Sequence, residues 1–521
     1  MLRSKLGRLS LIAILLGTVF GSAWVQSGQL HWTEERIHTS GLAAKRKVIL
    51  LLIDSMLSRS LEQLVMRNEA PALAFLMKNG LYRRDAISSF PTMSVTIDST
   101  ILTGTYADQH HVPGLLWFNQ SEKRMVDYGD GMRIVWKPGL PQWFEDSFFH
   151  LNHLHLSKKT RTLHEELSAK GFTTGSINGL LYRGQQGHHF GIKGMYTVRL
   201  QGPDLLALGA LSRVTDDYLP TSPFRSMGMN SDYTARSLIS LIKENRLPDV
   251  TLAYFPDMDG DLHKYGPAFL EGLKKVEVQL QHILNAFGNW EDALRQHVFL
   301  LMGDSGVTAT GTRRETALID LEETLSGLRP YRLGEELQPT DDVAFAVNGR
   351  MCYVYSLSER APLPAMIDRL KSDERIDLIA WQKDEWTHVR QGGRELRYRS
   401  GAERSDTFGK RWDVRGDFGV MNLKVRREDS RLVSDSHPDG LRRLQSALRS
   451  HAGRFLIATA RPGAEFTADG APNHPGGSNH GSLDASDSLV PLLIAPAGDV
   501  PSPPERLVDV KRYIMSLLEP K

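Results

Sequence analysis

Val48-Ile49-Leu50-Leu51-Leu52-Ile53 is an unbroken apolar run, bounded by Lys47 and Asp54. Such a run predicts a strand buried on both faces, as in a parallel sheet, because a strand with one solvated face alternates apolar and polar residues. Later apolar stretches predict further strands of the core: residues 172–177, 250–255, 297–302 and 489–494.

Segments with helical spacing of apolar residues separate these strands. The first of them ends at Asn79-Gly80, a typical C-terminal cap. The predicted helices span residues 61–78, 160–170, 231–245, 268–286 and 507–518. Because strands and helices alternate along the chain, we expect an α/β fold with a doubly wound, mostly parallel sheet.

The pattern of apolar and polar residues changes after about residue 312, where the chain becomes more charged and more alternating. Short alternating segments, such as Leu378-Ile379-Ala380-Trp381, predict the strands of a smaller α+β insertion domain. The Pro- and Gly-rich residues 462–478 predict a long functional loop. The expected parts are an N-terminal segment (1–27), the first part of the core (46–311), an inserted cap domain (312–465) and the second part of the core (466–521).

The composition is typical of a globular protein and excludes disorder for most of the chain. Of 521 residues, 41% are hydrophobic and 24% are charged, and the mean hydropathy is −0.30. The formal net charge is only +2, so the sequence carries no nucleic-acid-binding signature. Cys352 is the single cysteine, which rules out an intramolecular disulfide.

The N-terminus has the pattern of an export signal. Basic residues at positions 3, 5 and 8 precede an apolar stretch at residues 9–25. Gly21-Ser22-Ala23 offers small residues for cleavage, but the stretch is also long enough for an uncleaved anchor across ~30 Å of membrane. We expect an exported, extracytoplasmic protein, secreted or anchored, whose N-terminal segment engages the membrane or the export machinery.

Acidic residues directly follow three of the predicted buried strands. They are Asp54, Asp257, Asp259 and Asp304. Ligands of open α/β sheets bind at the carboxyl ends of the strands, so these carboxylates are candidate site residues. One such aspartate often only caps the next helix, but three positions in one fold favour a site.

Asp259 and His263 are four residues apart, so on a helix they share one face and form a workable pair of zinc ligands. Solvated contacts of this spacing are common, and a zinc site requires a third ligand. His480 is the candidate, because it lies in the Gly-rich segment Gly477-Ser478-Asn479-His480-Gly481-Ser482 just before a predicted strand.

Ser94 is the candidate nucleophile. Pro91 breaks the chain ahead of it, and the following apolar stretch predicts a helix that begins at Ser94. The hydroxyl would then stand at a helix N-terminus, where free N–H groups favour an anion. The alternative is that Ser94 only caps this helix.

Five short motifs occur in one order along the chain. They are Ile53-Asp54; Phe90-Pro91-Thr92-x-Ser94 with Thr103-Gly104 and Tyr106; Pro256-(x)2-Asp259-(x)3-His263-Lys264-Tyr265-Gly266-Pro267; Gly303-Asp304-Ser305-Gly306; and His480-Gly481. The ordered set resembles the alkaline phosphatase superfamily, and most closely its type I phosphodiesterase/nucleotide pyrophosphatase branch. The resemblance covers residues 47–311 and 476–518, whereas the insertion is only generally like the caps of the superfamily.

The resemblance implies two adjacent divalent metal ions, with zinc as the first expectation. One would be held by Asp259, His263 and His480, and the other by Asp54, Asp304 and the Ser94 oxygen. Such a pair lowers the pKa of the serine hydroxyl and stabilises the attacking and leaving oxygens of an in-line displacement. The implied activity is hydrolysis of a small phosphate ester, at a phosphodiester or pyrophosphate bond.

The sequence departs from the family pattern at three positions. Ser305 stands where the family has His, so the second site offers mainly oxygen and would also suit Mn, Mg or Ca. Ser94 replaces the usual Thr and keeps the nucleophilic oxygen. Leu115 falls where the nucleotide pyrophosphatases place an Asn that holds a phosphate oxygen. Asn119 and Asn178 are candidates to take its place, and the basic Arg183 is a separate candidate for contact with phosphate, with ordinary surface charge as the alternative.

Two alternatives to a phosphodiesterase remain open at this point. One is a phosphomonoesterase of the same superfamily. The other, motivated by Ser305, is a catalytically inactive envelope protein that binds a glycan, a lipid headgroup or a partner. A sulfatase is disfavoured, because residues 94–96 lack the Cys/Ser-x-Pro-x-Arg setting of its formylglycine precursor.

Overall fold

The computed structural model describes residues 46–129, 140–192, 196–211, 228–498 and 500–518. The predicted export segment, residues 1–27, lies outside them. Within the part of the chain described, no helix is both long and apolar enough to cross a membrane. Residues 189–199 belong to a small separate unit, and their described part contributes to the hairpin of β6 (Gln186–Ile192) and β7 (Tyr196–Gly202).

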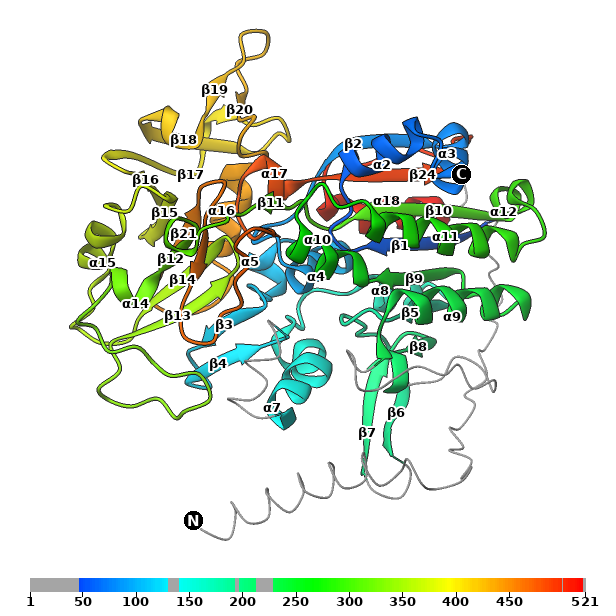
Figure 1. Ribbon diagram of the computed structural model, residues 1–521, viewed down its shortest axis with the longest axis horizontal. Coiled ribbons are helices and arrows are strands. Elements are labelled where there is room, and N and C mark those ends of the chain that lie inside the picture. The colour runs from blue at the N-terminus through cyan, green and yellow to red at the C-terminus, as the bar shows by residue number, and fades with distance from the viewer. Residues whose placement is uncertain (1–45, 130–139, 193–195, 212–227, 499, 519–521) are drawn as a thin grey trace. The chain divides into compact units, whose positions relative to one another are not determined.

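A seven-stranded sheet forms the centre of the larger unit (Figure 1). Its strands are β1 (Lys47–Ile53), β2 (Leu81–Ile87), β5 (Thr174–Ile177), β8 (Leu205–Ala207), β9 (Val250–Phe255), β10 (His297–Gly303) and β24 (Leu489–Ala495). The strand order is β2-β24-β10-β1-β9-β5-β8; β24 pairs antiparallel with β2 and with β10, and the other pairs are parallel. The predicted α/β fold with a mostly parallel sheet is confirmed.

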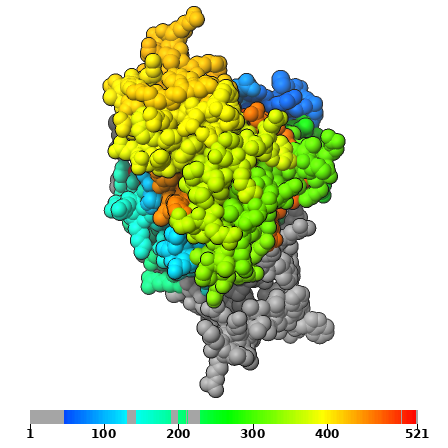
Figure 2. All heavy atoms as spheres, turned by 90° about the vertical axis from the view of Figure 1, so that its left-hand side faces the viewer, coloured from blue at the N-terminus to red at the C-terminus, as the bar shows by residue number. Residues whose placement is uncertain are grey.

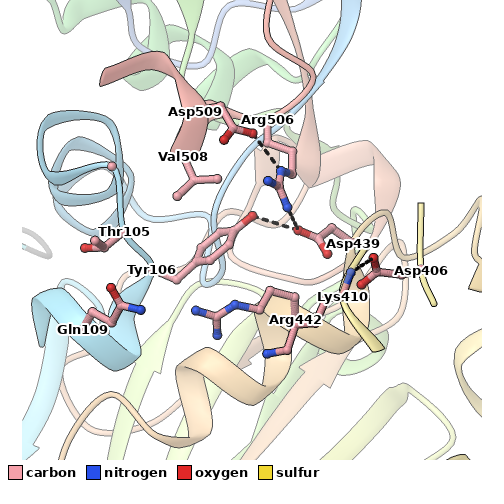
Figure 3. A pocket seen from close by; sticks show the side chains of 11 residues that line it. Thr105, Tyr106, Gln109, Asp406, Lys410, Asp439, Arg442, Arg506, Val508 and Asp509 are labelled. Atoms are coloured by element: carbon pink, nitrogen blue, oxygen red, sulfur yellow. Dashed lines mark hydrogen bonds and ion pairs between the residues drawn. The ribbon is translucent and has the colours of Figure 1, made fainter. Parts of the chain in front are cut away.

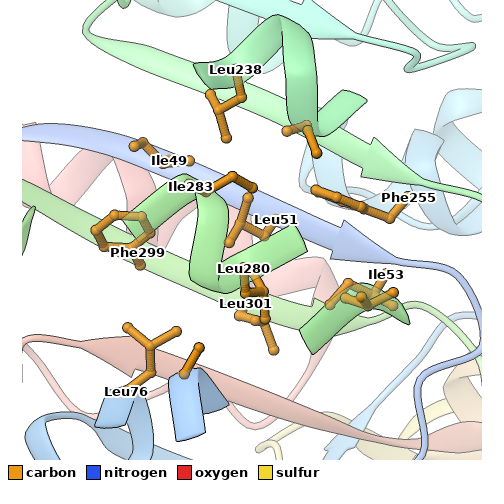
Figure 4. Close-up of a cluster of buried hydrophobic side chains, with 14 of the residues drawn as sticks. Ile49, Leu51, Ile53, Leu76, Leu238, Phe255, Leu280, Ile283, Phe299 and Leu301 are labelled. Atoms are coloured by element: carbon orange, nitrogen blue, oxygen red, sulfur yellow. The ribbon is translucent and has the colours of Figure 1, made fainter. Parts of the chain in front are cut away.

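Helices cover both faces of this sheet, which explains the unbroken apolar runs. Ile49, Leu51 and Ile53 of β1 pack into one hydrophobic cluster (Figure 4), and the alternate β1 residues pack into another. The first cluster includes α2 (Ser58–Met66), α3 (Pro71–Asn79), α9 (Ser231–Lys243), α11 (Glu271–Asn285) and α12 (Trp290–Gln296). The second includes α4 (Ser94–Thr103), α8 (Leu163–Ala169) and α18 (Val510–Leu518).

The strand register brings the ends of three parallel strands to one edge. Ile53 at the end of β1 pairs with Gly303 of β10 and with Phe255 of β9. Asp54 and Asp304 therefore leave the sheet side by side, and α10 (Asp257–Tyr265) begins just beyond β9. This edge carries the candidate site.

A second seven-stranded sheet is entirely antiparallel, with the order β13-β14-β21-β15-β16-β17-β18 for the strands bounded below. The strands are β13 (Val343–Asn348), β14 (Met351–Ser356), β15 (Ile376–Lys383), β16 (Trp386–Gln391), β17 (Arg394–Ser405), β18 (Arg411–Gly416) and β21 (Phe455–Ala460). Residues of this region, light green to yellow, form much of the surface in Figure 2. A separate antiparallel region is thus confirmed, whereas its expected limits, 312 and 465, stay a prediction.

Two local expectations were wrong, and one strand was not predicted. Residues 61–78 form two helices rather than one, because Asn68 takes a φ of 58° and Pro71 begins α3, where its missing N–H is tolerated. The predicted loop at residues 462–478 contains β22 (Glu465–Thr467), paired with β12 (Leu318–Asp320). Strand β2 was missed because this edge strand is largely polar and half exposed.

Candidate active site

Asp259, His263 and His480 come together at the carboxyl edge of the central sheet. One ligand atom from each lies within 4.8 Å of the others. His263 Nε2 is 3.2 Å from Asp259 Oδ2, and His480 Nε2 is 3.4 Å from Asp259 Oδ1. α10 supplies the first two side chains at the predicted spacing, and His480 follows the short strand β23 (Ser478–Asn479). The structure therefore assembles the three residues that the sequence singled out.

Both imidazoles of this cluster are oriented by backbone carbonyls. His263 Nδ1 donates to the carbonyl of Ser478 at 2.8 Å, and His480 Nδ1 donates to the carbonyl of Thr92 at 2.5 Å. Each Nε2 is then left facing Asp259. Metal-binding histidines characteristically use one ring nitrogen for such a contact and the other for the metal. One carboxylate and two imidazoles in this arrangement fit a zinc ion with an open position.

The electrostatics of the cluster are those of a carboxylate between two imidazoles. Burial disfavours the protonated form of His480, but the hydrogen bond and charge of Asp259 outweigh it and raise the pKa of His480 to about 9. Burial also acts to raise the pKa of Asp259, yet His263 and His480 hold that pKa well below its usual value. Without a metal, His480 therefore carries a proton at neutral pH.

Zinc binding to metal-free protein is expected to release a proton near neutral pH, because an imidazolium cannot ligate a metal. The affinity should rise with pH until His480 loses its proton at a pKa of about 9. Calorimetric titrations with zinc in buffers of different ionisation enthalpy measure this release. His480→Gln should lack it, and heats that do not depend on the buffer in the unsubstituted protein would contradict the prediction.

The loop that carries His480 fits closely against its surroundings. A Cβ at Gly477 would lie 1.9 Å from the carbonyl oxygen of His263. Gly481 has a φ of 116°, and a Cβ there would lie 2.2 Å from the carbonyl oxygen of Asn348. These close approaches explain why the segment is rich in glycine.

A fully buried ion pair also contacts the backbone of the loop that carries His480. Arg350 Nη1 lies 2.6 Å from Asp487 Oδ1, and neither side chain is exposed. The Arg350 N–H donates to the carbonyl of His480 at 2.7 Å, while Asp487 Oδ2 accepts from the N–H of Ser482 at 2.9 Å. The pair therefore fixes the loop on both sides of the His480 imidazole.

Asp487→Asn is expected to lower the free energy of unfolding by about 3 kcal/mol, because it leaves the Arg350 charge buried without a counterion. Urea unfolding measures the loss. Asp435→Asn is the matched control, since its ion pair with Lys424 is exposed, and its effect should stay below about 1 kcal/mol. Equal losses of unfolding free energy in the two variants would show that the effect does not depend on burial of the ion pair.

Asp54 and Asp304 form a second, purely carboxylate group. The Tyr254 hydroxyl donates to Asp54 Oδ2, and Asp304 Oδ1 accepts from the N–H groups of Ser55 at 2.8 Å and Ser305 at 2.6 Å. Among the described residues, Asp54 Oδ1 and Asp304 Oδ2 are buried without a hydrogen-bond partner. Such orphaned oxygens are rare in folded proteins, and a cation would satisfy them.

Burial raises the pKa values of both carboxylates. It raises the pKa of Asp54 well above its usual value, and the charges of Asp304 and Asp259 raise it further. Burial also raises the pKa of Asp304. Two neighbouring buried carboxylates repel one another unless one is protonated or a cation lies between them.

Ser305 takes part in a bridge between the two groups. Its hydroxyl lies 3.1 Å from that of Ser55, and Ser55 Oγ donates to Asp259 Oδ1 at 2.7 Å. Ser55 follows Asp54 directly and has a φ of 55°. The hydroxyl at position 305 is thus already engaged by a neighbouring serine.

Ser94 stands where the helix prediction placed it. It begins α4, and Met93, the cap residue, supplies no side-chain cap hydrogen bond. The half-buried Ser94 lies two residues after Thr92, whose carbonyl holds His480 and whose hydroxyl accepts from the N–H of Gly481 at 2.7 Å. The start of α4 is thereby tied to the loop that carries His480.

The candidate substrate residues all have partners of their own. Asn119 accepts from the N–H of Ser121 at 3.1 Å in the turn after β3 (Leu116–Asn119). Asn178 donates to the hydroxyl of Thr234 at 2.8 Å and accepts from the N–H of Gly209 at 3.0 Å. Arg183 pairs with Glu165 at 3.0 Å and donates to three backbone carbonyls. A part for them in substrate binding stays a prediction.

Sequence reasoning missed Tyr254 and Ser55. Tyr254 lies inside an apolar strand, where a phenol is usually part of the core, and only the register with β1 shows that it reaches Asp54. Ser55 carried one signal, namely its position directly after an aspartate that ends a buried strand.

Asp146, His150 and His155 form another group with the spacing of metal ligands. Here, however, the Arg124 guanidinium donates to both oxygens of Asp146, at 2.7 and 2.8 Å, while His155 Nδ1 contacts the hydroxyl of Tyr128 at 2.7 Å. A cation would have to displace the arginine, so this group is a structural ion-pair network.

A separate polar pocket lies around Tyr106 (Figure 3). The Tyr106 hydroxyl donates to Asp439 Oδ2 at 2.8 Å, and Arg506 also pairs with Asp439, at 3.4 Å. Arg442 pairs with Asp108 at 2.9 Å. Because these arginines already have carboxylate partners, the pocket is a weaker phosphate site than the edge of the sheet.

The fold and the clustered ligands define a class of protein, a hydrolase of the alkaline phosphatase superfamily with residues for divalent metals at the edge of its sheet. The model of the type I phosphodiesterase/nucleotide pyrophosphatase family matches residues 48–384, more than half of the chain. The chain belongs to this metal-dependent family. No curated protein matches the sequence.

Solved structures share the fold at low sequence identity. Murine ectonucleotide pyrophosphatase/phosphodiesterase 5, as an inactive variant in complex with AMP, is 12% identical with a TM-score of 0.55, over 91% of this chain and 95% of that one. Phosphonoacetate hydrolase from Sinorhizobium meliloti 1021, in complex with phosphonoacetate, is 14% identical with a TM-score of 0.53, over 95% of this chain and 100% of that one. These likenesses agree with the architecture described above.

Proposed function

We propose that the protein is an exported, metal-dependent hydrolase that cleaves phosphodiester or pyrophosphate bonds of small phosphate esters, with Ser94 as the nucleophile. The observation that carries the proposal is the meeting of the Asp259 cluster and the Asp54–Asp304 pair beside the start of α4. Family membership supports the class of bond.

Two cations fit these residues. Asp259, His263 and His480 would hold one, and Asp54, Asp304 and the Ser94 oxygen would hold the other. When bound, the cations would make the Ser94 hydroxyl more acidic and neutralise charge on the phosphate. The mixed nitrogen and oxygen donors of the first group suit zinc, and the oxygen donors of the second also suit Mn, Mg or Ca.

Different residues of the chain would supply the nucleophile, stabilise the phosphate oxygens and position the ligands. Ser94 Oγ would attack phosphorus, the bond to the leaving oxygen would break, and water would later cleave the phosphoryl group from Ser94. The free N–H groups at the start of α4 would stabilise the phosphate oxygens during both steps. Tyr254 and Ser55 would hold Asp54, Asp304 and Asp259 in place.

A direct test compares bis-p-nitrophenyl phosphate with p-nitrophenyl phosphate. Metal-stripped protein is resupplied with Zn, Mn, Mg or Ca, and we expect metal-dependent release of p-nitrophenol, faster from the diester. Faster hydrolysis of the monoester would favour the phosphomonoesterase alternative. No turnover under any metal, of these esters or of a pyrophosphate such as a dinucleotide, would favour the inactive binding protein.

Export is a separate part of the proposal and has its own test. Expression of the full chain in a Gram-negative bacterium, followed by cell fractionation, should place it outside the cytoplasm. Deletion of residues 1–27 should keep it in the cytoplasm. N-terminal sequencing would then distinguish a cleaved signal from a retained anchor.

A further inference from the structure

A buried carboxylate outside the two ligand groups contacts the Gly-rich loop that carries His480. Glu465 begins β22, its side chain is fully buried, and no Lys or Arg pairs with it among the described residues. Taking a charge out of water is costly unless hydrogen bonds or an opposite charge compensate. The partners of Glu465 therefore indicate what this carboxylate stabilises.

The described hydrogen-bond donors to the Glu465 carboxylate come from one short segment, residues 474–479. The N–H of His474 donates to Oε1 at 2.5 Å, and His474 Nδ1 donates to Oε2 at 3.2 Å. Asn479 Nδ2 also donates to Oε2. The carboxylate thus joins the two ends of this segment.

Each end of the segment contacts one histidine of the first ligand group. The His474 ring lies against the ring of His263, with the ring centroids 4.3 Å apart. Asn479 Oδ1 accepts from the N–H of His480 at 2.8 Å. One carboxylate therefore reaches both histidines, each through a single intervening residue.

The second sheet fixes the position of this carboxylate. The N–H of Phe466, the residue after Glu465, donates at 3.1 Å to the carbonyl of Gly349 in the turn between β13 and β14. The next residue of that turn, Arg350, donates its N–H to the carbonyl of His480. The same turn thus holds both β22 and the loop, which gives the second sheet a part in the site.

We propose that Glu465 and His474 are positioning residues of the first cation site. Through them the loop fixes the ring of His263 and the backbone of His480, so that both Nε2 atoms keep facing Asp259. The inference rests on the proposed function, since it concerns one of the two cation sites described there. Substitution of a residue that orients metal ligands typically costs about 10- to 100-fold in metal affinity.

The test measures zinc binding rather than activity. Competition with a chromophoric chelator gives the zinc affinity of metal-stripped protein, with excess Mg²⁺ present for the oxygen ligands of the second site. Glu465→Gln should weaken zinc binding about 10- to 100-fold, because a carboxamide keeps only one acceptor oxygen for the three donors. Glu165→Gln is the matched control, since it loses an ion pair with Arg183 on α8 and should destabilise the fold without changing zinc affinity.

Cobalt gives a readout that a merely structural role would not move. One equivalent of Co²⁺ in place of zinc has a visible absorption spectrum that depends on the number and direction of its ligands. The spectrum should change in Glu465→Gln and in His474→Ala and stay unchanged in Glu165→Gln. In the double variant of Glu465 and His474, the loss of zinc affinity should equal that of Glu465→Gln alone, because removal of the carboxylate already releases His474.

Three outcomes would overturn the inference: unchanged zinc affinity in Glu465→Gln, an unchanged cobalt spectrum in that variant, and additive losses in the double variant. If Glu465→Gln does not fold, the partly exposed His474→Ala replaces it and should weaken zinc binding about 10-fold; an unchanged affinity there would count equally against the inference.

The same measurements separate this inference from the proposed function. The expected zinc affinities in a protein that hydrolyses no ester would refute the proposed function and leave the positioning roles in place. Absence of zinc binding in the unsubstituted protein would overturn both.

Discussion

Ser94→Ala is expected to lower kcat for diester hydrolysis by roughly 10⁴- to 10⁶-fold, because no other group replaces the nucleophilic oxygen. The fold should survive, since the Ser94 side chain is half-buried and α4 has no side-chain cap to lose. Steady-state kinetics with bis-p-nitrophenyl phosphate, at saturating metal, measure the loss.

Two further variants make this result specific to Ser94. Ser94→Thr keeps a hydroxyl at the same position and should retain activity within about 100-fold, whereas Ser99→Ala removes a hydroxyl that donates to the carbonyl of Val95 and should be nearly silent. Acid quenching during turnover should leave a p-nitrophenyl phosphoryl group on Ser94, detectable by mass spectrometry. Activity of Ser94→Ala within tenfold of normal would place the nucleophile elsewhere.

The carboxylates at the edge of the sheet were predictable because the end of a buried strand is visible in the local sequence. Apolar runs that stop at an acidic residue fixed both the strands and the positions of Asp54 and Asp304, and the parallel register then brought them together. Asp259 and His263 were predictable for a similar reason, since a spacing of four residues determines which helix face they share. His480 was proposed from its Gly-rich context just before a predicted strand, and the family resemblance implied the same role.

The side-chain roles that the sequence could not predict depend on partners far away in the sequence. Tyr254 looks like a core residue until β9 pairs with β1, which brings its hydroxyl to Asp54. Asn178 illustrates the opposite case, since a plausible phosphate ligand is already held by Thr234 and Gly209. Local pattern therefore predicts which elements form, whereas side-chain roles depend on the packing between them.

The bridge through Ser55 links the two groups of ligands. Its N–H donates to Asp304 and its hydroxyl donates to Asp259. A displacement of either carboxylate would therefore move Ser55 and alter its hydrogen bond to the other. The positive φ of Ser55 turns the chain sharply after β1 and makes both contacts available to one residue. Loss of an Asp259 oxygen should therefore disturb the Asp54–Asp304 group as well as the group of Asp259, His263 and His480.

Asp259→Asn is expected to remove one bound metal per chain and to lower kcat/KM at least about 10³-fold, because the only anionic ligand of the first group is lost. Metal analysis and steady-state kinetics measure the two effects. Asp261→Asn, on the same helix and paired with Lys275 at 3.2 Å, is the matched control and should change neither.

The same substitution should also change stability in metal-free protein, with a pH dependence whose sign follows from His480. Its folded pKa is raised to about 9 by Asp259, so the ion pair stabilises the fold fully below about pH 6.5, the unfolded pKa of histidine, and loses its effect as the pH rises through about 9. The destabilisation by Asp259→Asn should therefore be largest near pH 6 and small above about pH 9.5. Urea unfolding in EDTA at these two pH values measures it, and a destabilisation that does not decline with pH would show that Asp259 stabilises the fold other than through His480.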